Sequence, residues 1–128
     1  MTKIMVVDDE PDLVDVVRLI LESDGYEVVT ASGGQEALEK ITVEMPALVL
    51  LDIIMPKMDG WEVFSRIKGN PKTSEIPVIM LTAKDQRIDK LIGLHVVKVN
   101  DYITKPFGRA ELLERIKKVL REAKKVAQ

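Results

Sequence analysis

The stretch Ala47-Leu48-Val49-Leu50-Leu51-Asp52 is apolar over its first five residues and then ends on a carboxylate. A strand that is apolar throughout, with no polar alternation, is typical of a parallel sheet that is covered on both faces. The same pattern occurs at residues 4–7, which are followed by Asp8-Asp9, and at residues 78–81, which are followed by Thr82. These runs predict the central strands of a sheet that is buried on both sides.

Helical patterns separate the apolar runs. Between residues 11 and 25, apolar residues recur with the spacing of an amphipathic helix. The stripe comprises Leu13, Val16, Val17, Ile20 and Leu21. Pro11 suits the first turn of this helix and Asp24-Gly25 its C-terminal end, while Ser32 can cap the next helix. Similar stripes predict further helices around residues 37–41, 63–67, 88–92 and 112–123.

Two more strands complete the alternation, one near residues 26–30 and one near residues 101–104, which ends at Lys105-Pro106. Repeated strand–helix units imply a parallel sheet with helices on both faces, because right-handed crossovers need a covering helix. We therefore predict an α/β fold with a doubly wound five-stranded parallel sheet in the flavodoxin-like order 2-1-3-4-5. The length of 128 residues suits one domain spanning residues 1–128.

The composition excludes several classes of protein. The chain has no cysteine and a single histidine, His95, which excludes disulfides, thiolate zinc sites, cysteine nucleophiles and multi-histidine metal centres. Nineteen basic and 21 acidic residues give a net charge of -2, which argues against nucleic acid as an obligatory direct partner. No apolar run approaches the ~18 residues of a membrane span, and no signal peptide opens the chain. We expect a cytoplasmic protein without membrane insertion.

Polar side chains stand at the carboxyl ends of four predicted strands, where open α/β sheets bind their ligands. They are Asp8, Asp9, Asp52, Thr82 and Lys105. Three carboxylates that converge there repel each other unless a cation intervenes. Mg²⁺ suits such oxygen ligands, and the lysine supplies a second positive charge. The set is therefore suited to a phosphoryl group.

The same set contains its own nucleophile. A carboxylate can attack phosphorus directly to form an aspartyl-phosphate, and it needs no general base because it is already deprotonated. Phosphoryl transfer asks the protein mainly for alignment and charge compensation. The site therefore needs neither a histidine nor a cysteine of its own.

Four segments, in this order and spacing, carry a resemblance to a known family. They are Val6-Val7-Asp8-Asp9-Glu10, Leu51-Asp52-Ile53-Ile54-Met55-Pro56-Lys57-Met58-Asp59-Gly60, Leu81-Thr82-Ala83 and Asp101-Tyr102-Ile103-Thr104-Lys105-Pro106-Phe107. Over essentially its whole length the chain resembles the receiver domain of two-component response regulators, and in size it is close to the single-domain chemotaxis type. It departs from the family at Lys98-Val99-Asn100, where a glycine and an alanine are usual before the fifth strand.

The resemblance implies roles for the acidic residues. Asp52 corresponds to the phosphoacceptor. Asp9 corresponds to a direct Mg²⁺ ligand, and Asp8 assists directly or through water. The backbone carbonyl of Ile54 completes the metal ligands of the protein.

The resemblance also implies how the phosphoryl group is sensed. Lys105 is expected to contact it, with a cis Lys105-Pro106 bond. Thr82 corresponds to the hydroxyl that moves toward the phosphoryl oxygen, and Tyr102 to the aromatic residue that changes position with it.

The implied function is that of a signalling module and not of an enzyme. A sensor histidine kinase transfers phosphate from a phosphohistidine to Asp52. The output face, which is formed by the fourth and fifth helices and the fifth strand, then changes its affinity for a target. Hydrolysis of the aspartyl-phosphate resets the switch. The target is a separate protein or a C-terminal output domain absent from this chain. The domain is expected to be a monomer or a phosphorylation-dependent dimer.

Other interpretations remain open from the residues alone. Asp8 or Asp9 can be a helix cap, Asp59-Gly60 can serve only the turn, and the basic excess in residues 109–128 can be a solvated helix face or a docking surface. An aspartate-nucleophile phosphatase needs a second aspartate at the position of Ile54. A flavin mononucleotide carrier needs a phosphate loop where Asp8-Asp9-Glu10 stands. A receiver that has lost its chemistry is the third alternative function.

Overall fold

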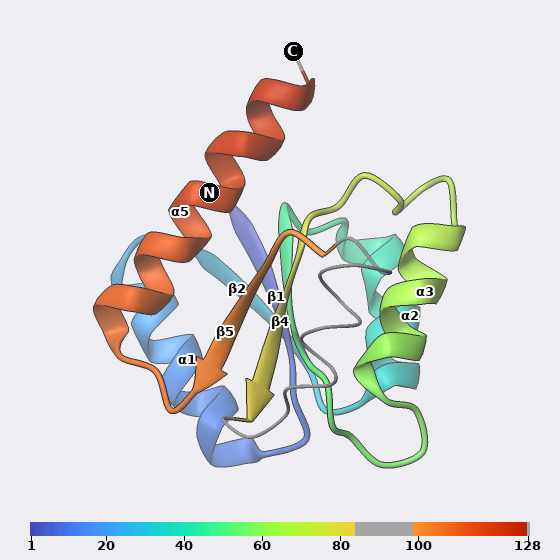
Figure 1. Ribbon diagram of the computed structural model, residues 1–128, viewed down its shortest axis with the longest axis horizontal. Coiled ribbons are helices and arrows are strands. Elements are labelled where there is room, and N and C mark those ends of the chain that lie inside the picture. The colour runs from blue at the N-terminus through green and yellow to red at the C-terminus, as the bar shows by residue number, and fades with distance from the viewer. Residues whose placement is uncertain (84–98, 128) are drawn as a thin grey trace.

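The computed structural model describes residues 1–83 and 99–127 (Figure 1). Its elements in chain order are β1 (Lys3–Val7), α1 (Pro11–Ser23), β2 (Glu27–Ala31), α2 (Gly34–Glu44), β3 (Leu48–Asp52), α3 (Gly60–Gly69), β4 (Val78–Ala83), β5 (Asp101–Lys105) and α5 (Arg109–Ala127). The helix predicted around residues 88–92 lies outside the described residues. None of the helices in the described part of the chain combines the length and apolar composition needed to cross a membrane.

The five strands form one parallel sheet in the order β2-β1-β3-β4-β5, which confirms the predicted topology. The first strand lies between the second and the third, so that Val7 pairs with Ala31 on one side and with Leu51 on the other. The chain moves to one side after β1 and crosses back to the other side before β3. That reversal places the carboxyl ends of β1 and β3 next to each other.

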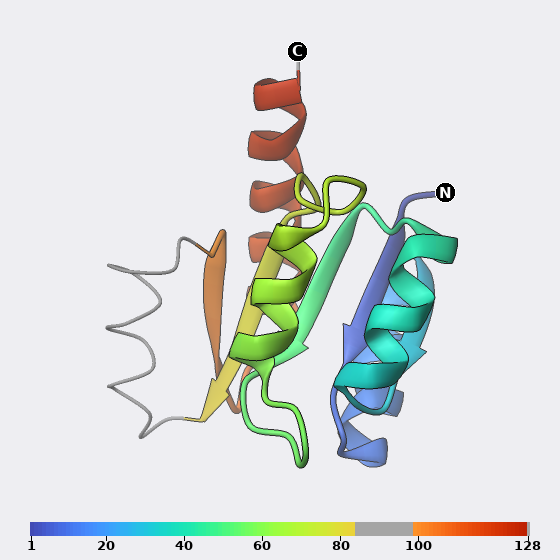
Figure 2. The ribbon, with the colours of Figure 1, turned by 90° about the vertical axis from the view of Figure 1, so that its right-hand side faces the viewer.

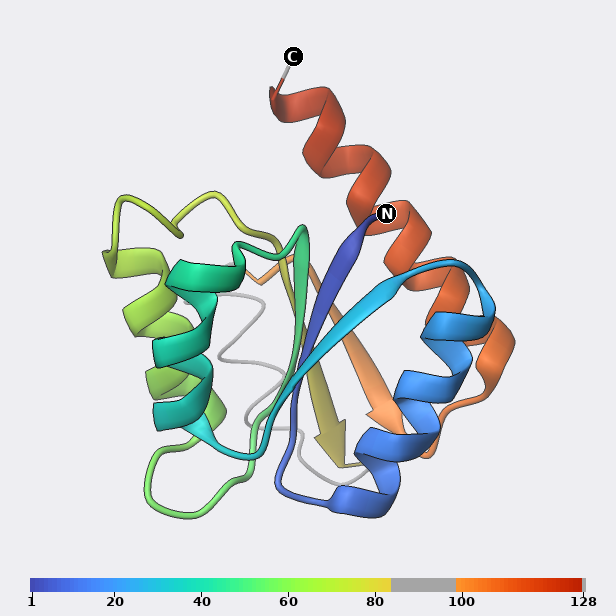
Figure 3. The same ribbon diagram turned by 180° about the vertical axis from the view of Figure 1, so that it is seen from behind.

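Helices cover both faces of the sheet, as the apolar strands predicted. In Figures 1 and 2, α1 and α5 lie on one face and α2 and α3 on the other, and Figure 3 shows the same layers from behind. Alternate residues of a strand point to opposite faces. Ile4 and Val6 of β1 therefore join the core beneath α1 and α5, whereas Met5 and Val7 join the core beneath α2 and α3.

Two local predictions were wrong. The buried stripe of α1 consists of Val14, Val17 and Leu21, whereas Val16 is 52% exposed, because residue 16 is turned away from the helix face that these three residues define. Ser32 does not cap α2. Gly33 occupies the N-cap position, and both the backbone N–H and the hydroxyl of Ser32 donate to Glu36 Oε1, at 2.9 Å each. Glu36 thus accepts hydrogen bonds from Ser32, whereas the predicted cap has the serine oxygen accept a hydrogen bond from a backbone N–H of the helix.

The loop that follows β3 is held close to the sheet by the start of α3. Asp59 is the N-cap of α3 and accepts a hydrogen bond from the backbone N–H of Glu62 at 3.0 Å. The Gly60 N–H donates to the carbonyl oxygen of Ile53 at 2.7 Å. A side chain at residue 60 would collide with the backbone of Asp52 and Ile53, so the glycine lets the helix begin directly beside the end of β3.

Candidate functional site

The carboxyl ends of β1, β3 and β5 bring two buried carboxylates and one ammonium together, at the edge of the sheet toward which the arrows point in Figure 1. Asp8 follows β1, and Asp52 and Lys105 are the last residues of β3 and β5. The Lys105 Nζ lies 3.0 Å from Asp8 Oδ2 and 3.3 Å from Asp52 Oδ1. Asp8 is 1% exposed and Asp52 is 5% exposed, so the lysine compensates charges that have little contact with water.

A third carboxylate, from Glu10, belongs to the same cluster. Its Oε1 lies 3.5 Å from Lys105 Nζ, and its backbone N–H donates to Asp8 Oδ1 at 3.0 Å, which fixes the orientation of that carboxylate. One oxygen each from Asp8, Glu10 and Asp52 lie within 4.8 Å of one another, and this group could hold a metal ion. Glu10 was not predicted from the sequence as a site residue. The sequence does contain a signal for Glu10, because it is the third consecutive acidic residue after β1.

The cluster opens into a pocket of about 310 Å³. Its described lining consists of Asp9, Glu10, Asp52, Ile54, Ala83 and Lys105. Asp9 is exposed at the rim and lies outside the group of three converging carboxylates. The Ile54 side chain is 60% exposed at the same rim. The pocket thus has an acidic wall, a basic wall and an apolar edge.

Burial and the neighbouring carboxylates act on the pKa of Asp52 in one direction, and Lys105 acts in the other. Loss of water and the neighbouring charge of Asp8 raise the pKa of Asp52 from 3.8 to about 6, although Lys105 pulls it downward, and Asp9 adds to the rise. For Lys105, burial alone would lower the pKa, but the hydrogen bond to Asp8 and the charges of Asp52 and Asp8 outweigh it and raise the pKa. At neutral pH the carboxylate is therefore largely ionised and the amine is protonated.

The remaining predicted residues lie behind the pocket. Thr82 is fully buried at the end of β4, and its hydroxyl donates to the Ala83 carbonyl oxygen at 3.2 Å. Tyr102 of β5 packs against the core beneath α2 and α3, and its ring meets Trp61 edge-on with centroids 6.5 Å apart. Neither residue is among the described residues that line the pocket. His95 lies outside the described residues.

Two further sequence features lie at the two ends of β5. The Lys105-Pro106 peptide bond is cis, as predicted. The departure at residue 100 has a structural role, because Asn100 Oδ1 accepts a hydrogen bond from the backbone N–H of Val78 at 2.8 Å and the Asn100 N–H donates to the Val78 carbonyl oxygen at 3.0 Å. Asn100 therefore ties the approach to β5 to the start of β4.

Comparisons with known proteins agree with this arrangement. The sequence profile of the response regulator receiver domain matches residues 4–117. The chain is 45% identical over 121 residues to the alkaline phosphatase synthesis transcriptional regulatory protein PhoP of Bacillus subtilis, and the match covers 94% of the chain but only 49% of that relative. The chain thus spans about half the length of this curated relative.

Solved structures give the same result. A CheY-like response regulator receiver domain protein of Methanospirillum hungatei superposes with a TM-score of 0.89 at 34% identity, covering 98% of each chain. A response regulator receiver domain protein of Clostridium thermocellum has a TM-score of 0.89 at 29% identity, covering 100% of each chain. With its 2-1-3-4-5 sheet, its acidic pocket beside a partly buried lysine and its match to the family profile, this chain belongs to the response regulator receiver domain family.

Proposed function

We propose that the chain is a phosphorylation switch of a two-component system in which Asp52 accepts the phosphoryl group. The observation that carries this proposal is the contact of Lys105 Nζ with both Asp52 and Asp8, at the floor of an open pocket. A buried carboxylate with an ammonium 3.3 Å away can approach an anionic phosphoryl group that bare carboxylates would repel.

The donor set fits Mg²⁺. The carboxylates of Asp8, Asp9, Glu10 and Asp52 at this pocket outnumber the positive charge of Lys105, so an excess of negative charge remains for a divalent cation to compensate. We propose that Asp8, Asp9, Asp52 and the Ile54 carbonyl hold the ion, with Asp8 acting directly or through water. Once bound, Mg²⁺ supplies charge compensation for the phosphoryl oxygens.

The proposed transfer needs no proton-accepting side chain. An ionised Oδ of Asp52 forms a bond to phosphorus while the bond between phosphorus and the phosphohistidine nitrogen of the kinase breaks, and the electron pair of that bond leaves with the imidazole. Lys105 then pairs with a phosphoryl oxygen in place of part of its present contacts. The Ile54 side chain at the rim has no proton to transfer, so the site lacks an acid or base at this position for the turnover of external phosphate esters. This supports a domain that accepts one phosphoryl group and resets by hydrolysis.

The consequences of phosphorylation are proposed to pass through Thr82 and Tyr102. Thr82 is the next-to-last residue of β4, at the same sheet edge as Asp52, and Tyr102 lies on the adjoining β5, with its ring against Trp61. A shift of the threonine hydroxyl toward the phosphoryl group would bias the position of the tyrosine and thereby the output face.

The proposed partners are a sensor histidine kinase and either a separate target protein or a C-terminal output domain. The Bacillus subtilis relative is named as a transcriptional regulator, which supports a role in gene control for this chain's pathway. We propose that the receiver domain takes in residues 1–128, works in the cytoplasm, and is a monomer or a phosphorylation-dependent dimer.

The direct test is incubation of the chain with Mg²⁺ and acetyl phosphate, followed by intact-mass measurement. Addition of one phosphoryl group that is lost in the Asp52→Asn variant and on chelation of the metal is expected. The matched control is Asp15→Asn, which removes an exposed carboxylate of α1 that does not line the pocket. Addition that survives Asp52→Asn would overturn the assignment.

A further inference from the structure

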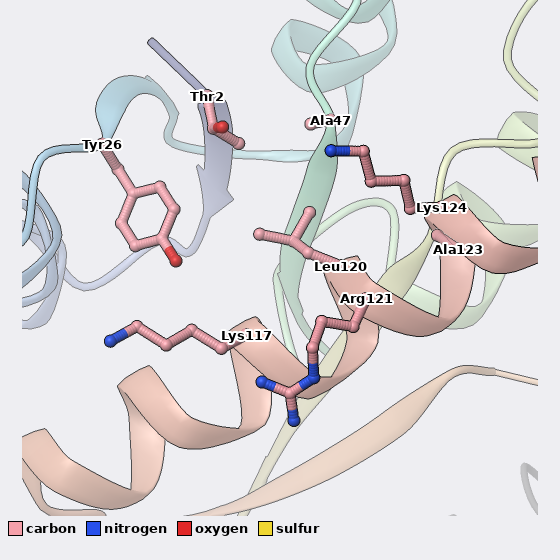
Figure 4. A pocket seen from close by; sticks show the side chains of 8 residues that line it. All are labelled: Thr2, Tyr26, Ala47, Lys117, Leu120, Arg121, Ala123 and Lys124. Carbon is pink, nitrogen blue, oxygen red and sulfur yellow. The ribbon is translucent and has the colours of Figure 1, made fainter.

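A second hollow lies at the opposite end of the sheet from Asp52, between the C-terminal half of α5 and the amino ends of the strands. Figure 4 shows its side chains. Its volume is about 560 Å³, and its lining consists of Thr2, Tyr26, Ala47, Lys117, Leu120, Arg121, Ala123 and Lys124. We call this hollow the α5 groove. Neither the acidic site nor the proposed transfer uses any of these residues.

Three cations line the α5 groove on one side of the helix. Lys117, Arg121 and Lys124 follow each other at intervals of four and three residues, which places them along one helix face over about 10 Å. Lys117 lies 3.3 Å from Asp24, so part of its charge is already compensated. Arg121 and Lys124 are exposed and form no ion pair with a carboxylate in the part of the chain that the structure describes.

The floor between these cations is apolar. Leu120 and Tyr26 are half-buried and pack against the core beneath α1 and α5. Ala47 and Ala123 add two small side chains that keep the groove open. In Figure 4 the ring of Tyr26 faces α5 across the hollow. The side chain of Leu120 lies between those of Lys124 and Arg121. A solvated basic helix face needs no such floor.

We propose that the α5 groove docks an acidic peptide segment whose carboxylates face Lys117, Arg121 and Lys124 and whose apolar side chain lies on Leu120 between them. The charge pattern of the groove complements a segment with acidic residues three and four positions apart around one apolar residue. Nucleic acid fits less well, because the chain carries a net charge of -2 and Asp24 stands at the edge of the groove.

The proposal concerns binding in the unphosphorylated protein and is independent of the function proposed for Asp52. The probe is a fluorescein-labelled helical peptide with glutamates three and four residues apart on one face and a leucine between them, followed by fluorescence anisotropy. Binding that weakens as salt rises, and that is lost when glutamines replace the glutamates, is expected. Asp52→Asn should bind equally well, so a failure of the phosphoacceptor assignment leaves this test intact.

The decisive variants differ only in where the charge is reversed. The double variant Arg121→Glu/Lys124→Glu should weaken peptide binding by about tenfold or more, the loss expected when complementary charge contacts become repulsive. The control Lys72→Glu/Lys118→Glu reverses two exposed cations outside the α5 groove and should bind within about twofold of wild type. Equal weakening in both variants, absence of binding, or tighter binding of a random DNA duplex than of the peptide would each overturn the proposal.

Discussion

Opposing effects of neighbouring residues set the ionisation of Asp52. The carboxylate is buried beside Asp8, which favours protonation, and the ammonium 3.3 Å away favours ionisation. Three carboxylates share one lysine, so the cluster carries more negative charge than its own cation can compensate. We therefore expect this excess of negative charge to lower the stability of the folded protein when no metal ion is bound.

The stability of the metal-free protein should reveal this imbalance. The pKa of Asp52 in the folded chain is about 6, above its ordinary value of 3.8, so the folded state binds the proton more tightly and the free energy of unfolding falls as pH rises from 3.8 to 6. Asp52→Asn removes this loss. We expect the variant to be more stable than wild type by about 1–3 kcal/mol at neutral pH, with the difference shrinking toward pH 4. Urea unfolding of both proteins in the presence of a chelator measures this difference. Equal stability of wild type and Asp52→Asn at neutral pH as well as at pH 4 would contradict the prediction.

The contribution of Lys105 can be measured on its neighbour. Since the charge and the hydrogen bond of the lysine both lower the pKa of Asp52, Lys105→Met should raise that pKa further above 6. Carbon NMR of the aspartate carboxyl groups, assigned by comparison with Asp52→Asn, reports the shift directly. Lys72→Met, at an exposed position, is the control and should leave the titration unchanged. An unchanged or lowered pKa in Lys105→Met would contradict the electrostatic account.

At this scale the sequence predicts which residues meet at the sheet edge but not how they share the site. Asp8, Asp52 and Lys105 could be found because each ends an apolar strand, and parallel strands end at one edge. Glu10 could not be placed in the same way, because it follows β1 by three residues and its direction depends on the turn that joins its N–H to Asp8. The exposed position of Asp9 depends on that same turn.

The start of α3 lies directly against the strand end that carries Asp52. Its first residue, Gly60, lies against the backbone of Asp52, and its N-cap, Asp59, fixes the direction in which the helix leaves. The start of this helix therefore supports the end of β3, which carries the proposed phosphoacceptor.

The close approach at Gly60 predicts a sensitive position. In Gly60→Ala the new Cβ would lie 2.8 Å from Ile53 Cα and even closer to the Asp52 carbonyl oxygen, so the backbone at the end of β3 has to shift. We expect a loss of about 1–3 kcal/mol in unfolding free energy and slower phosphorylation by acetyl phosphate. Gly69→Ala in the same helix meets no atom within 4 Å and should be neutral or slightly stabilising. Equal behaviour of the two variants in urea unfolding would contradict this.

The elements themselves were largely predictable, and the two errors have local causes. Continuous apolar runs mark strands that are buried on both faces, and apolar residues at helical spacing mark helices that are buried on one face, so their alternation gives the order of strands and helices. The stripe of α1 was misjudged because Val16 is apolar yet exposed, and composition alone does not distinguish an exposed valine from a buried one. Ser32 was misjudged because Gly33 can take the extended N-cap conformation while Glu36 reaches back to the serine.

On the scale of the whole molecule, the two ends of the sheet have opposite character. The carboxyl ends gather Asp8, Glu10 and Asp52, and the amino ends face the α5 groove with its cations. In Figure 1 the C-terminal turns of α5 extend past the amino ends of the strands. A partner at the α5 groove would therefore leave the acidic pocket accessible to a phosphodonor.

Metal binding should stabilise the whole domain. A ligand that binds only the folded state at a hundred times its Kd adds about 2.7 kcal/mol to the free energy of unfolding. We expect Mg²⁺ to raise the Tm of wild type and to have a much smaller effect on Asp9→Asn, whereas Asp15→Asn should respond like wild type because its carboxylate does not line the pocket. Thermal unfolding with and without Mg²⁺ measures this. A full Mg²⁺ response in Asp9→Asn would exclude Asp9 as a ligand.

The central claim, that Asp52 becomes the acyl phosphate, can be tested by trapping. Borohydride reduces an aspartyl-phosphate to homoserine, and peptide mass spectrometry then locates the modified residue. After treatment with acetyl phosphate and Mg²⁺, homoserine is expected at residue 52 and not at residues 8 or 9. Homoserine at either of those aspartates, or at no aspartate of a chain whose mass shows phosphorylation, would contradict the account.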